Sequence, residues 1–292
     1  MSYRIVHRTA YTYESSVSAS YGELYLLPRG SDAQRVVMAR VEIEPLPDTY
    51  GERSDFFGNR AANFAVLKGH TTLTVTTTSV VDVTGRPIPP LGSGPSWESA
   101  HAVLHSSLEP DVLEARQFVL DSPGVVVTEA VRAYAAPSFT PGRPLVDVLG
   151  DLTTRINHDF AYKPGVTDLH TTPDELLELR KGVCQDFSHL QIACMRAYGL
   201  AARYISGYLE TIPPPGKAKL QGADVSHAWV SAFVPTIGWV DVDPTNDLFV
   251  GTRHICTAWG RDYADISPLK GVIFTEAKTN TMKVSVDVTP EP

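Results

Sequence analysis

Three residues in the second half of the chain carry functional groups that together can perform nucleophilic catalysis. Cys184 lies in the segment GVCQDFSH, His227 in SHAWVSAF and Asp243 in GWVDVDPTN. A cysteine thiolate attacks a carbonyl carbon, a histidine takes and returns a proton, and a carboxylate orients the imidazole. The order Cys-His-Asp, with separations of 43 and 16 residues, therefore predicts covalent catalysis on the cysteine sulfur.

The residues that follow Cys184 predict an amphipathic helix with the cysteine in its first turn. Apolar side chains recur on one face of this helix, at Phe187, Leu190, Cys194 and Ala197. Gly199 suits the position just beyond the helix end. The free N–H groups and the dipole of the first turn favour a thiolate over a thiol. We interpret Cys194 as a packing residue, and we can name no partner for Cys256.

His227 and Asp243 are predicted to lie on the two strands of a β-hairpin. Residues 228–235 and 238–242 both have a strand pattern, and a short turn separates them. Within this hairpin the Asp243 carboxylate can reach the His227 imidazole, fix its tautomer and stabilise the imidazolium. Asp241 lies two residues earlier on the same face of the strand, so it is the rival for this role.

The three segments closely resemble the core motifs of the transglutaminase-like superfamily, in its bacterial branch. The resemblance implies a papain-like core, in which a helix with the cysteine packs on an antiparallel sheet with the histidine and aspartate. It implies Cys184 as the nucleophile, His227 as the base and Asp243 as the third member of the triad. The N-terminal part also resembles the β-domain that commonly precedes this core in bacterial members.

The elements that must position these residues divide the chain into three parts. Residues 1–85 are rich in β-branched and aromatic residues between turn signals, which predicts a small β-rich domain, either a sandwich or a curved sheet. Residues 86–96 are rich in Pro and Gly and are predicted to be a linker. Residues 97–292 are predicted to hold a helical segment followed by the catalytic core, so the fold class is α+β. Helices are predicted within residues 97–108, 111–120, 125–136 and 145–160, and a last strand within 281–288.

Several residues near the predicted site need a role. The backbone N–H of Cys184 is the natural oxyanion donor, and Tyr162 and Gln185 are both candidates for an additional side-chain donor. Asp186 would disfavour the thiolate if it were unpaired. We therefore expect Arg203 or another donor to hold the Asp186 carboxylate away from the sulfur.

Three further features of the sequence could be functional or purely structural. His189 lies on a different helix face from Cys184 and is expected to pack or to form a hydrogen bond. His101 and His105 have helical i, i+4 spacing but lack the glutamate of the HExxH zinc motif, and no EF-hand pattern is present. We therefore expect no metal and no cofactor. Residues 212–224, rich in Pro and Lys, form either one wall of the cleft or a long connector.

Composition restricts the partners and the compartment. The formal net charge is −8, so the chain repels phosphate groups, and we expect neither nucleic acid nor an anionic membrane as a partner. The N-terminus has no apolar signal segment and no run of about 18 apolar residues occurs, which predicts a cytoplasmic protein. Three cysteines argue against a disulfide framework.

The predicted site leaves two chemical outcomes open. If water resolves the thioester, the enzyme is a protease, amidase or isopeptidase; if an amine resolves it, the enzyme is a transglutaminase. We favour hydrolysis of a peptide or amide bond, with a peptide or protein as the substrate. A non-catalytic peptide-binding module and a metal-dependent hydrolase built on His101 and His105 are the alternatives. The sequence gives no oligomeric state.

Overall fold

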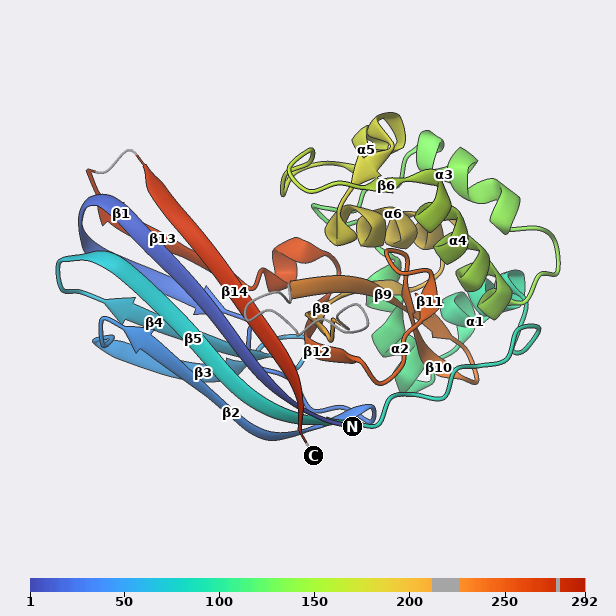
Figure 1. The fold of residues 1–292 in the computed structure, drawn as a ribbon. Coiled ribbons are helices and arrows are strands. Elements are labelled where there is room, and N and C mark those ends of the chain that lie inside the picture. Colours follow the sequence, from blue (N-terminus) through green and yellow to red (C-terminus); the bar gives the residue numbers. More distant parts are fainter. Residues whose placement is uncertain (212–225, 277–278, 292) are drawn as a thin grey trace, which may run out of the picture.

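A computed structural model describes residues 1–211, 226–276 and 279–291 of the chain. They form one seven-stranded antiparallel sheet, folded into two layers and called the sandwich below, on one side and a mixed helix-and-sheet core on the other (Figure 1). The strands of the sandwich are β1 (Ser2–Leu24), β2 (Gln34–Glu44), β3 (Thr49–Ser54), β4 (Arg60–Val66), β5 (His70–Val83), β13 (Leu269–Thr275) and β14 (Asn280–Glu291). The predicted β-rich N-terminal region and the α+β class are both confirmed.

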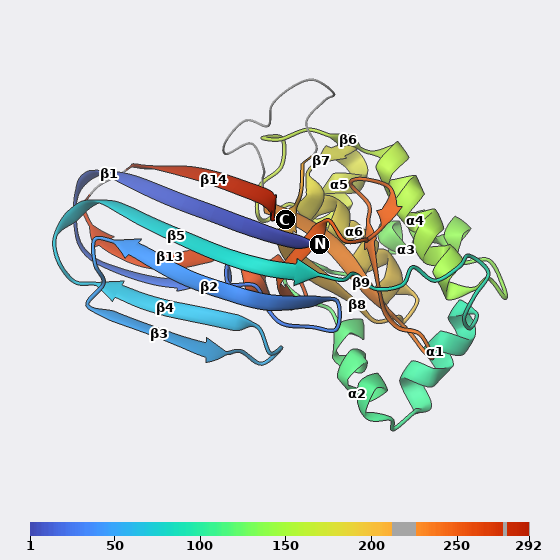
Figure 2. The same ribbon diagram turned by 60° about the horizontal axis from the view of Figure 1, so that its bottom comes forward.

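The strand β1 is long enough to take part in both layers of the sandwich. From Ser2 to Thr12 it pairs with β5 and β14, and from Ser20 to Leu24 it pairs with β4 and β13. β2 extends the first layer beside β5, and β3 extends the second beside β4. Figure 2 shows β14, β1, β5 and β2 side by side in the first layer. Apolar side chains from both layers, among them Leu24, Phe64 and Val75, fill the space between them.

The last strands of the chain belong to the sandwich and not to the catalytic core. Ser2 of β1 pairs with Glu291 of β14, so the two ends of the chain lie together (Figure 1). Our assignment of residues 97–292 to one helical and catalytic part is therefore wrong for residues 269–291. Local alternation marks a strand but does not say which sheet it joins, since the partners of these residues lie 245 to 289 residues away in the chain.

The core is built on a five-stranded antiparallel sheet in the order β11-β10-β9-β8-β12. Its strands are β8 (Ala202–Leu209), β9 (Ser226–Val234), β10 (Gly238–Asp243), β11 (Leu248–Phe249) and β12 (His254–Gly260), and a separate pair is β6 (Ala161–Tyr162) with β7 (Lys181–Gly182). β9 and β10 form the predicted hairpin, in which Val234 is paired with Gly238. This hairpin brings His227, at the start of β9, and Asp243, at the end of β10, to the same end of the sheet.

Six α-helices surround this sheet in the described part of the chain. They are α1 (Trp97–Ser106), α2 (Pro110–Arg116), α3 (Glu129–Ala135), α4 (Leu145–Asp159), α5 (Pro173–Leu179) and α6 (Cys184–Ala197), with short 3-10 helices η1 (Gln117–Val119), η2 (Ala136–Ser138) and η3 (Tyr263–Ile266). The four predicted helices correspond to α1–α4. Of the described helices, none has the length and apolar content to cross a lipid bilayer.

The helix α6 is almost entirely buried and packs on β9 and β8 (Figure 1). It ends as predicted, with Gly199 just beyond it at a φ of 67°. A small apolar cluster joins the core sheet to the sandwich, through Tyr208 and Ile255 on one side and Tyr3, Ile5, Val81, Val83, Val286 and Val288 on the other. The sandwich is therefore anchored along the β8–β12 edge of the sheet that carries the candidate site.

Candidate active site

The N-terminus of α6 presents Cys184 at its first helical position. Val183 precedes it in an extended conformation, and its N–H donates a hydrogen bond of 2.7 Å to the Asp186 Oδ2. The Thr167 hydroxyl donates to the same oxygen at 2.8 Å. Asp186 therefore closes the first turn and fixes the neighbouring loop. A Cβ atom at Gly182 would lie 2.7 Å from that carboxylate oxygen, so only glycine leaves room for it.

Of the two alternatives expected for Asp186, Arg203 or another donor, the second is correct, because Thr167 and the Val183 N–H hold the carboxylate. Burial raises the pKa of Asp186, and these two hydrogen bonds oppose that effect. Arg203 lies elsewhere, stacked between the rings of Trp239 and Trp259. The reason is strand alternation, which sends the Arg203 side chain to the sheet face opposite α6.

The two candidate oxyanion donors lie beside the cysteine in different ways. Tyr162 pairs with Gly182 through the β6–β7 bridge, and its side chain is half-exposed. Burial, and then the charge of Cys184, raise the pKa of the Tyr162 phenol, so the hydroxyl stays protonated and able to donate. Gln185 is buried, and its Nε2 has no hydrogen-bond partner among the described residues. Both remain candidates for the donor.

The His227 imidazole connects Cys184 to Asp243. Its Nε2 lies 2.7 Å from the Asp243 Oδ2, and the Cys184 side chain lies near enough to the same ring to act on its pKa. Since Nε2 must donate to the carboxylate, Nδ1 is the nitrogen left for the sulfur. Burial alone would lower the pKa of His227, but the bonds to Asp243 and Cys184 outweigh it and raise the pKa to about 10. The site is therefore suited to an imidazolium paired with a thiolate.

The Asp243 carboxylate is fully buried and is the centre of a hydrogen-bond network. Its Oδ1 accepts from the backbone N–H groups of Thr245 at 2.9 Å and Asn246 at 3.2 Å. Its Oδ2 also accepts from the Asn246 side chain at 2.7 Å and from the His254 Nε2 at 3.0 Å. Burial raises the pKa of Asp243, but the bonds from the two histidines dominate and hold it well below its ordinary value. This carboxylate is therefore ionised at neutral pH.

Sequence reasoning missed His254 and Asn246. Asn246 follows Asp243 in the segment DPTN, where an Asx-type turn was the available signal. His254 lies on β12, the edge strand beside β8, and nothing local in the sequence places it next to Asp243. The curvature of the sheet brings His254 to Asp243, and the order of residues along the chain does not predict that curvature.

The rival residues lie apart from the triad. Asp241 forms an ion pair with Arg86, at 3.3 Å between the Nη1 and Oδ2 atoms, and it has no contact with His227. His189 is buried and accepts a hydrogen bond from the Tyr263 backbone N–H, as expected. Residues 212–224, predicted as a wall or a connector, lie outside the described residues.

One group of side chains has the composition of a metal site. His227, Asp243 and His254 offer ligand atoms within 4.8 Å of one another. However, both histidines approach the same Asp243 oxygen at 2.7 and 3.0 Å, the lengths of hydrogen bonds. The other ring nitrogen of a metal-bound histidine is usually hydrogen-bonded, whereas the His254 Nδ1 has no partner among the described residues. The arrangement therefore fits a hydrogen-bond network better than a metal centre. His101 and His105, whose rings lie 4.2 Å apart on α1, have no third ligand in the described residues.

Comparison with known proteins gives the family. Residues 134–244 match the transglutaminase-like superfamily, and residues 3–82 match the bacterial transglutaminase-like N-terminal region. Protein Rv2569c of Mycobacterium tuberculosis is 48% identical over 296 residues, covering 99% of this chain and 92% of that protein. The chain belongs to the transglutaminase-like superfamily. Protein ML0607 of Mycobacterium leprae is 33% identical and covers 98% of both chains.

Two other similarities bear on this transglutaminase-like chain. A protein-glutamine γ-glutamyltransferase from Pseudomonas aeruginosa is 37% identical over 98 residues, which is 32% of this chain and 15% of that protein. A crystal structure of a proposed cysteine protease from Cytophaga hutchinsonii covers 100% of this chain and 92% of its own, with a TM-score of 0.76 and 22% identity. The second similarity shows that the sandwich and the core recur together as one fold.

Proposed function

We propose that this chain is a cysteine enzyme that hydrolyses peptide or carboxamide bonds through a thioester on Cys184. The observation that carries the proposal is the position of His227, which bonds Asp243 at 2.7 Å and reaches the Cys184 side chain at the start of α6. The superfamily and its solved fold support the class of enzyme. Neither decides which acceptor resolves the thioester.

The reaction follows from the charges of the site. The Cys184 thiolate attacks the carbonyl carbon, and the oxyanion that forms is stabilised by the N–H groups at the start of α6. The His227 imidazolium then donates its proton to the departing amine as the C–N bond breaks, leaving a thioester. A water molecule attacks the thioester while neutral His227 takes its proton. The acid product leaves, and the thiolate–imidazolium pair is restored.

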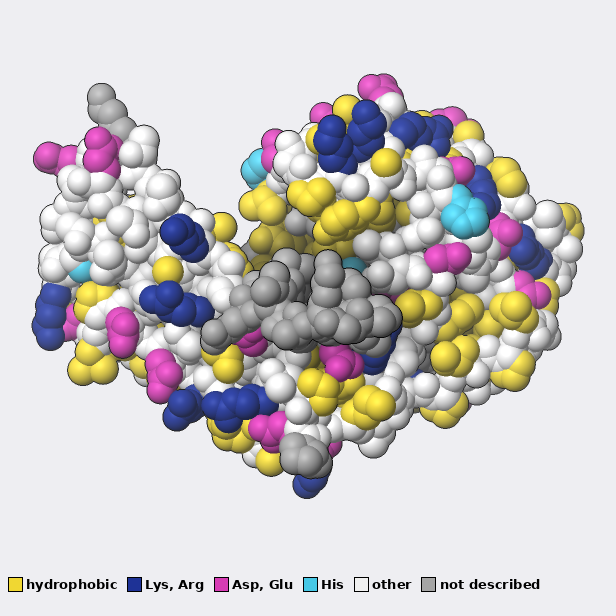
Figure 3. Space-filling model, viewed as in Figure 1, with side chains coloured by type: hydrophobic (Ala, Val, Ile, Leu, Met, Phe, Trp, Pro, Cys, Tyr) yellow, Lys and Arg dark blue, Asp and Glu magenta, His cyan; other side chains and the backbone are white. Residues whose placement is uncertain are grey.

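The shape of the surface supports a peptide or protein as the substrate. A hollow separates the sandwich from the core, and hydrophobic side chains gather on its core wall (Figure 3). A depression of about 240 Å³ on the core is lined by Val126, Leu169 and Tyr263, and none of Cys184, His227 and Asp243 lines it. Such a surface accepts an apolar side chain of an extended chain. A cytoplasmic location stays a prediction from the sequence.

Transfer of the acyl group to an amine is the second candidate. It is favoured by the similarity to the Pseudomonas aeruginosa protein-glutamine γ-glutamyltransferase over 98 residues. In this case a lysine-like amine replaces water in the second half of the reaction, and His227 takes the proton from that amine instead. All earlier steps and all residue roles are the same.

The test uses mass spectrometry of peptides incubated with the enzyme, with and without a fluorescent primary amine. Cleaved peptides or glutamine converted to glutamate support hydrolysis, whereas amine adducts that form in preference to acid support transfer. Cys184→Ala should abolish every product. Cys194→Ala, a buried thiol on the same helix, should leave turnover nearly unchanged. Products that persist in Cys184→Ala would overturn the mechanism.

A further inference from the structure

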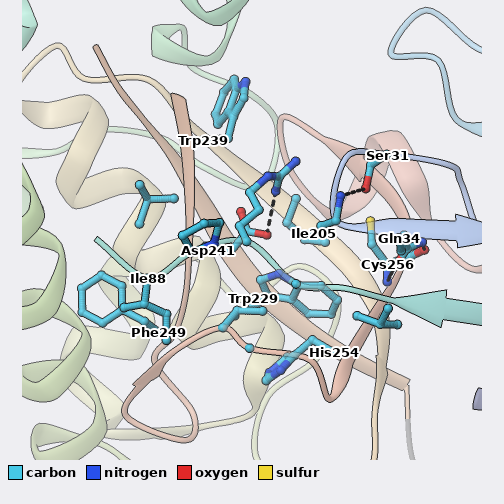
Figure 4. Close-up of a pocket in the computed structure, with 18 of the residues that line it drawn as sticks. Ser31, Gln34, Ile88, Ile205, Trp229, Trp239, Asp241, Phe249, His254 and Cys256 are labelled. Atoms are coloured by element: carbon cyan, nitrogen blue, oxygen red, sulfur yellow. Dashed lines mark hydrogen bonds and ion pairs between the residues drawn. The ribbon is translucent and has the colours of Figure 1, made fainter. Parts of the chain in front are cut away.

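A cavity of about 40 Å³ lies on the sheet face that carries Arg203 and Asp241 (Figure 4). Its floor consists of core strands, with Arg203 and Ile205 from β8, Trp229 from β9, Trp239 and Asp241 from β10, and His254 and Cys256 from β12. Its roof consists of residues 85–89 and Gln34. Residues 86–89, which belong to the segment predicted as a linker, therefore cover this cavity on the side away from the sheet.

The walls of this cavity contain buried polar atoms without partners. The Arg203 Nε, the Trp229 Nε1, the His254 Nδ1 and the Asp241 Oδ1 all lack a hydrogen bond within the described residues. The first three side chains are only 2%, 1% and 5% exposed. Buried polar groups are almost always paired in folded proteins. Four such atoms around one cavity indicate that something polar occupies it.

The Arg203 side chain is held in a way that directs its N–H groups to the cavity. The guanidinium lies 3.8 Å from the ring centres of both Trp239 and Trp259, so the two rings cover its faces. Only the edge of the guanidinium plane, where the donors are, stays available for hydrogen bonds. Burial lowers the pKa of Arg203 to about 9, so the group is still a cation at neutral pH.

The charges around the cavity leave one positive charge in excess. Arg86 and Arg203 are cationic, and Asp241, which pairs with Arg86 at 3.3 Å, is the anionic group. Burial raises the pKa of the Cys256 thiol to about 12, so it contributes no charge. Arg29 lies outside the cavity, over the Trp259 ring, and its guanidinium donates a hydrogen bond to the Phe57 carbonyl. A buried cation without a counter-ion is costly.

We propose that this cavity binds a small monovalent anion, of the size of a halide or formate, on Arg203 and Trp229. The volume holds about three water-sized particles, so the anion fits together with one or two waters. One water donates to the Asp241 Oδ1, the acceptor that the anion cannot satisfy. The single negative charge balances the single excess positive charge of the walls.

His254 connects the cavity to the candidate catalytic groups. Its ring lines the cavity, and its Nε2 donates to the Asp243 Oδ2 at 3.0 Å. A ring that donates from Nε2 accepts at Nδ1, so a water held beside the anion can donate to that nitrogen. His254 is thus a positioning residue that links the occupant of the cavity to the carboxylate of the triad.

Intrinsic fluorescence tests the site, because three of the four tryptophans line the cavity. Bromide, a quencher, is titrated at constant ionic strength with gluconate as the balancing anion, which is too large to enter. We expect saturable quenching that chloride or formate reverses; the stronger competitor identifies the physiological class. Arg203→Met should abolish the saturable phase, and Arg35→Met, an exposed arginine whose side chain is 78% accessible, should retain it.

A second variant protects the test against misfolding. Trp229→Phe removes one N–H donor together with part of the buried ring, and it should weaken bromide binding several-fold while the fold stays intact by circular dichroism. Anomalous diffraction from bromide-grown crystals should show a peak against Arg203. Quenching that is linear and equal in all variants, or a cavity that holds only water in those crystals, would overturn the proposal. Neither readout depends on catalysis, so failure here leaves the proposed function untouched.

Discussion

The two faces of the five-stranded sheet have opposite characters. Along β9, Ala228, Val230 and Ala232 point to the face that packs under α6 and belong to the main apolar core. The residues that alternate with them, His227, Trp229 and Ser231, point to the opposite face of the sheet. Across the sheet that set includes both histidines around Asp243, the Arg86–Asp241 pair and the stacked Arg203.

This difference teaches how the sheet combines stability with chemistry. The apolar face fixes the register of the strands, because a slip of one residue would exchange the two sets. The polar face can then hold buried charges in set positions, at a cost in desolvation that the apolar face offsets. Substitutions on the apolar face should therefore change stability alone, whereas substitutions of the charged and histidine side chains on the polar face should change chemistry as well as stability.

The largest effect should come from the centre of the polar face. Asp243→Ala leaves two histidines and two backbone N–H groups without their acceptor, so we expect a loss of about 3–5 kcal/mol in unfolding free energy. Activity should fall about 10³–10⁴-fold, since the imidazole loses its orientation. Urea unfolding and turnover measure the two effects. Asp247→Asn, an exposed acid with φ of 51°, is the matched control, and a similar loss there would remove the distinction.

The pH dependence of stability should identify His227 as the buried cation. Its pKa is raised to about 10 in the folded state. The paired Cys184 thiolate has released the proton that an unfolded thiol keeps up to about pH 8.5, so the folded and unfolded chains hold equal numbers of protons on these two groups between about pH 6.5 and 8.5. From about pH 8.5 to 10 only the folded state keeps a proton there, so the unfolding free energy should decrease in that window by up to about 1.4 kcal/mol per unit. In His227→Gln this decrease should be smaller. Parallel curves for the two proteins would contradict the raised pKa.

A pair of neighbours on β9 compares the two faces directly. Val230→Ala should destabilise the fold by about 1–3 kcal/mol through a lost side-chain volume in the apolar core, with kcat/KM nearly unchanged. Ser231→Ala on the opposite face removes a buried hydroxyl that has no partner in the described residues, so its stability should be equal or slightly higher. Thermal unfolding decides both, and a reversed order would show that the apolar face does not dominate stability.

A smaller effect is expected at the histidine that sequence reasoning missed. His254→Phe removes one of several hydrogen bonds to Asp243, so kcat should fall about 10-fold with little change in KM. His254→Gln, which retains a donor, should recover part of this activity. A shift in the pH–rate profile of His254→Phe would support a positioning role. Equal losses in both variants, together with an unchanged profile, would indicate packing alone.

The smallest effect should be that of chelation. Because the His227, Asp243 and His254 contacts have hydrogen-bond lengths, EDTA should leave turnover unchanged. Activity measured before and after dialysis against EDTA gives the result. Loss of activity that zinc restores would assign the polar face to a metal centre instead.

The sequence was sufficient for the parts of the site that are local in the chain. The helix from Cys184 and the β9–β10 hairpin follow from periodicity within about 15 residues, and both form as predicted. The choice of Asp243 over Asp241 also agrees with the geometry, because Asp241 is used by Arg86.

The parts that failed depend on contacts between distant segments. The return of residues 269–291 to β1 is a choice of sheet partner, which alternation cannot specify. The position of Arg203 between Trp239 and Trp259 joins three strands. His254 reaches Asp243 only because the sheet curves at that edge. Each of these requires the tertiary fold, and the last two lie on the polar face.

The central claim is that His227 and Cys184 form an ion pair, and the pH dependence of iodoacetamide labelling tests it most directly. Mass spectrometry maps the label to each of the three cysteines in wild type and in His227→Ala. We expect Cys184 to label selectively at mildly acid pH, where an ordinary thiol is protonated, and to lose this reactivity in the variant. Labelling of Cys184 only at alkaline pH, equal in both proteins, would contradict the ion pair and the enzyme proposed from it.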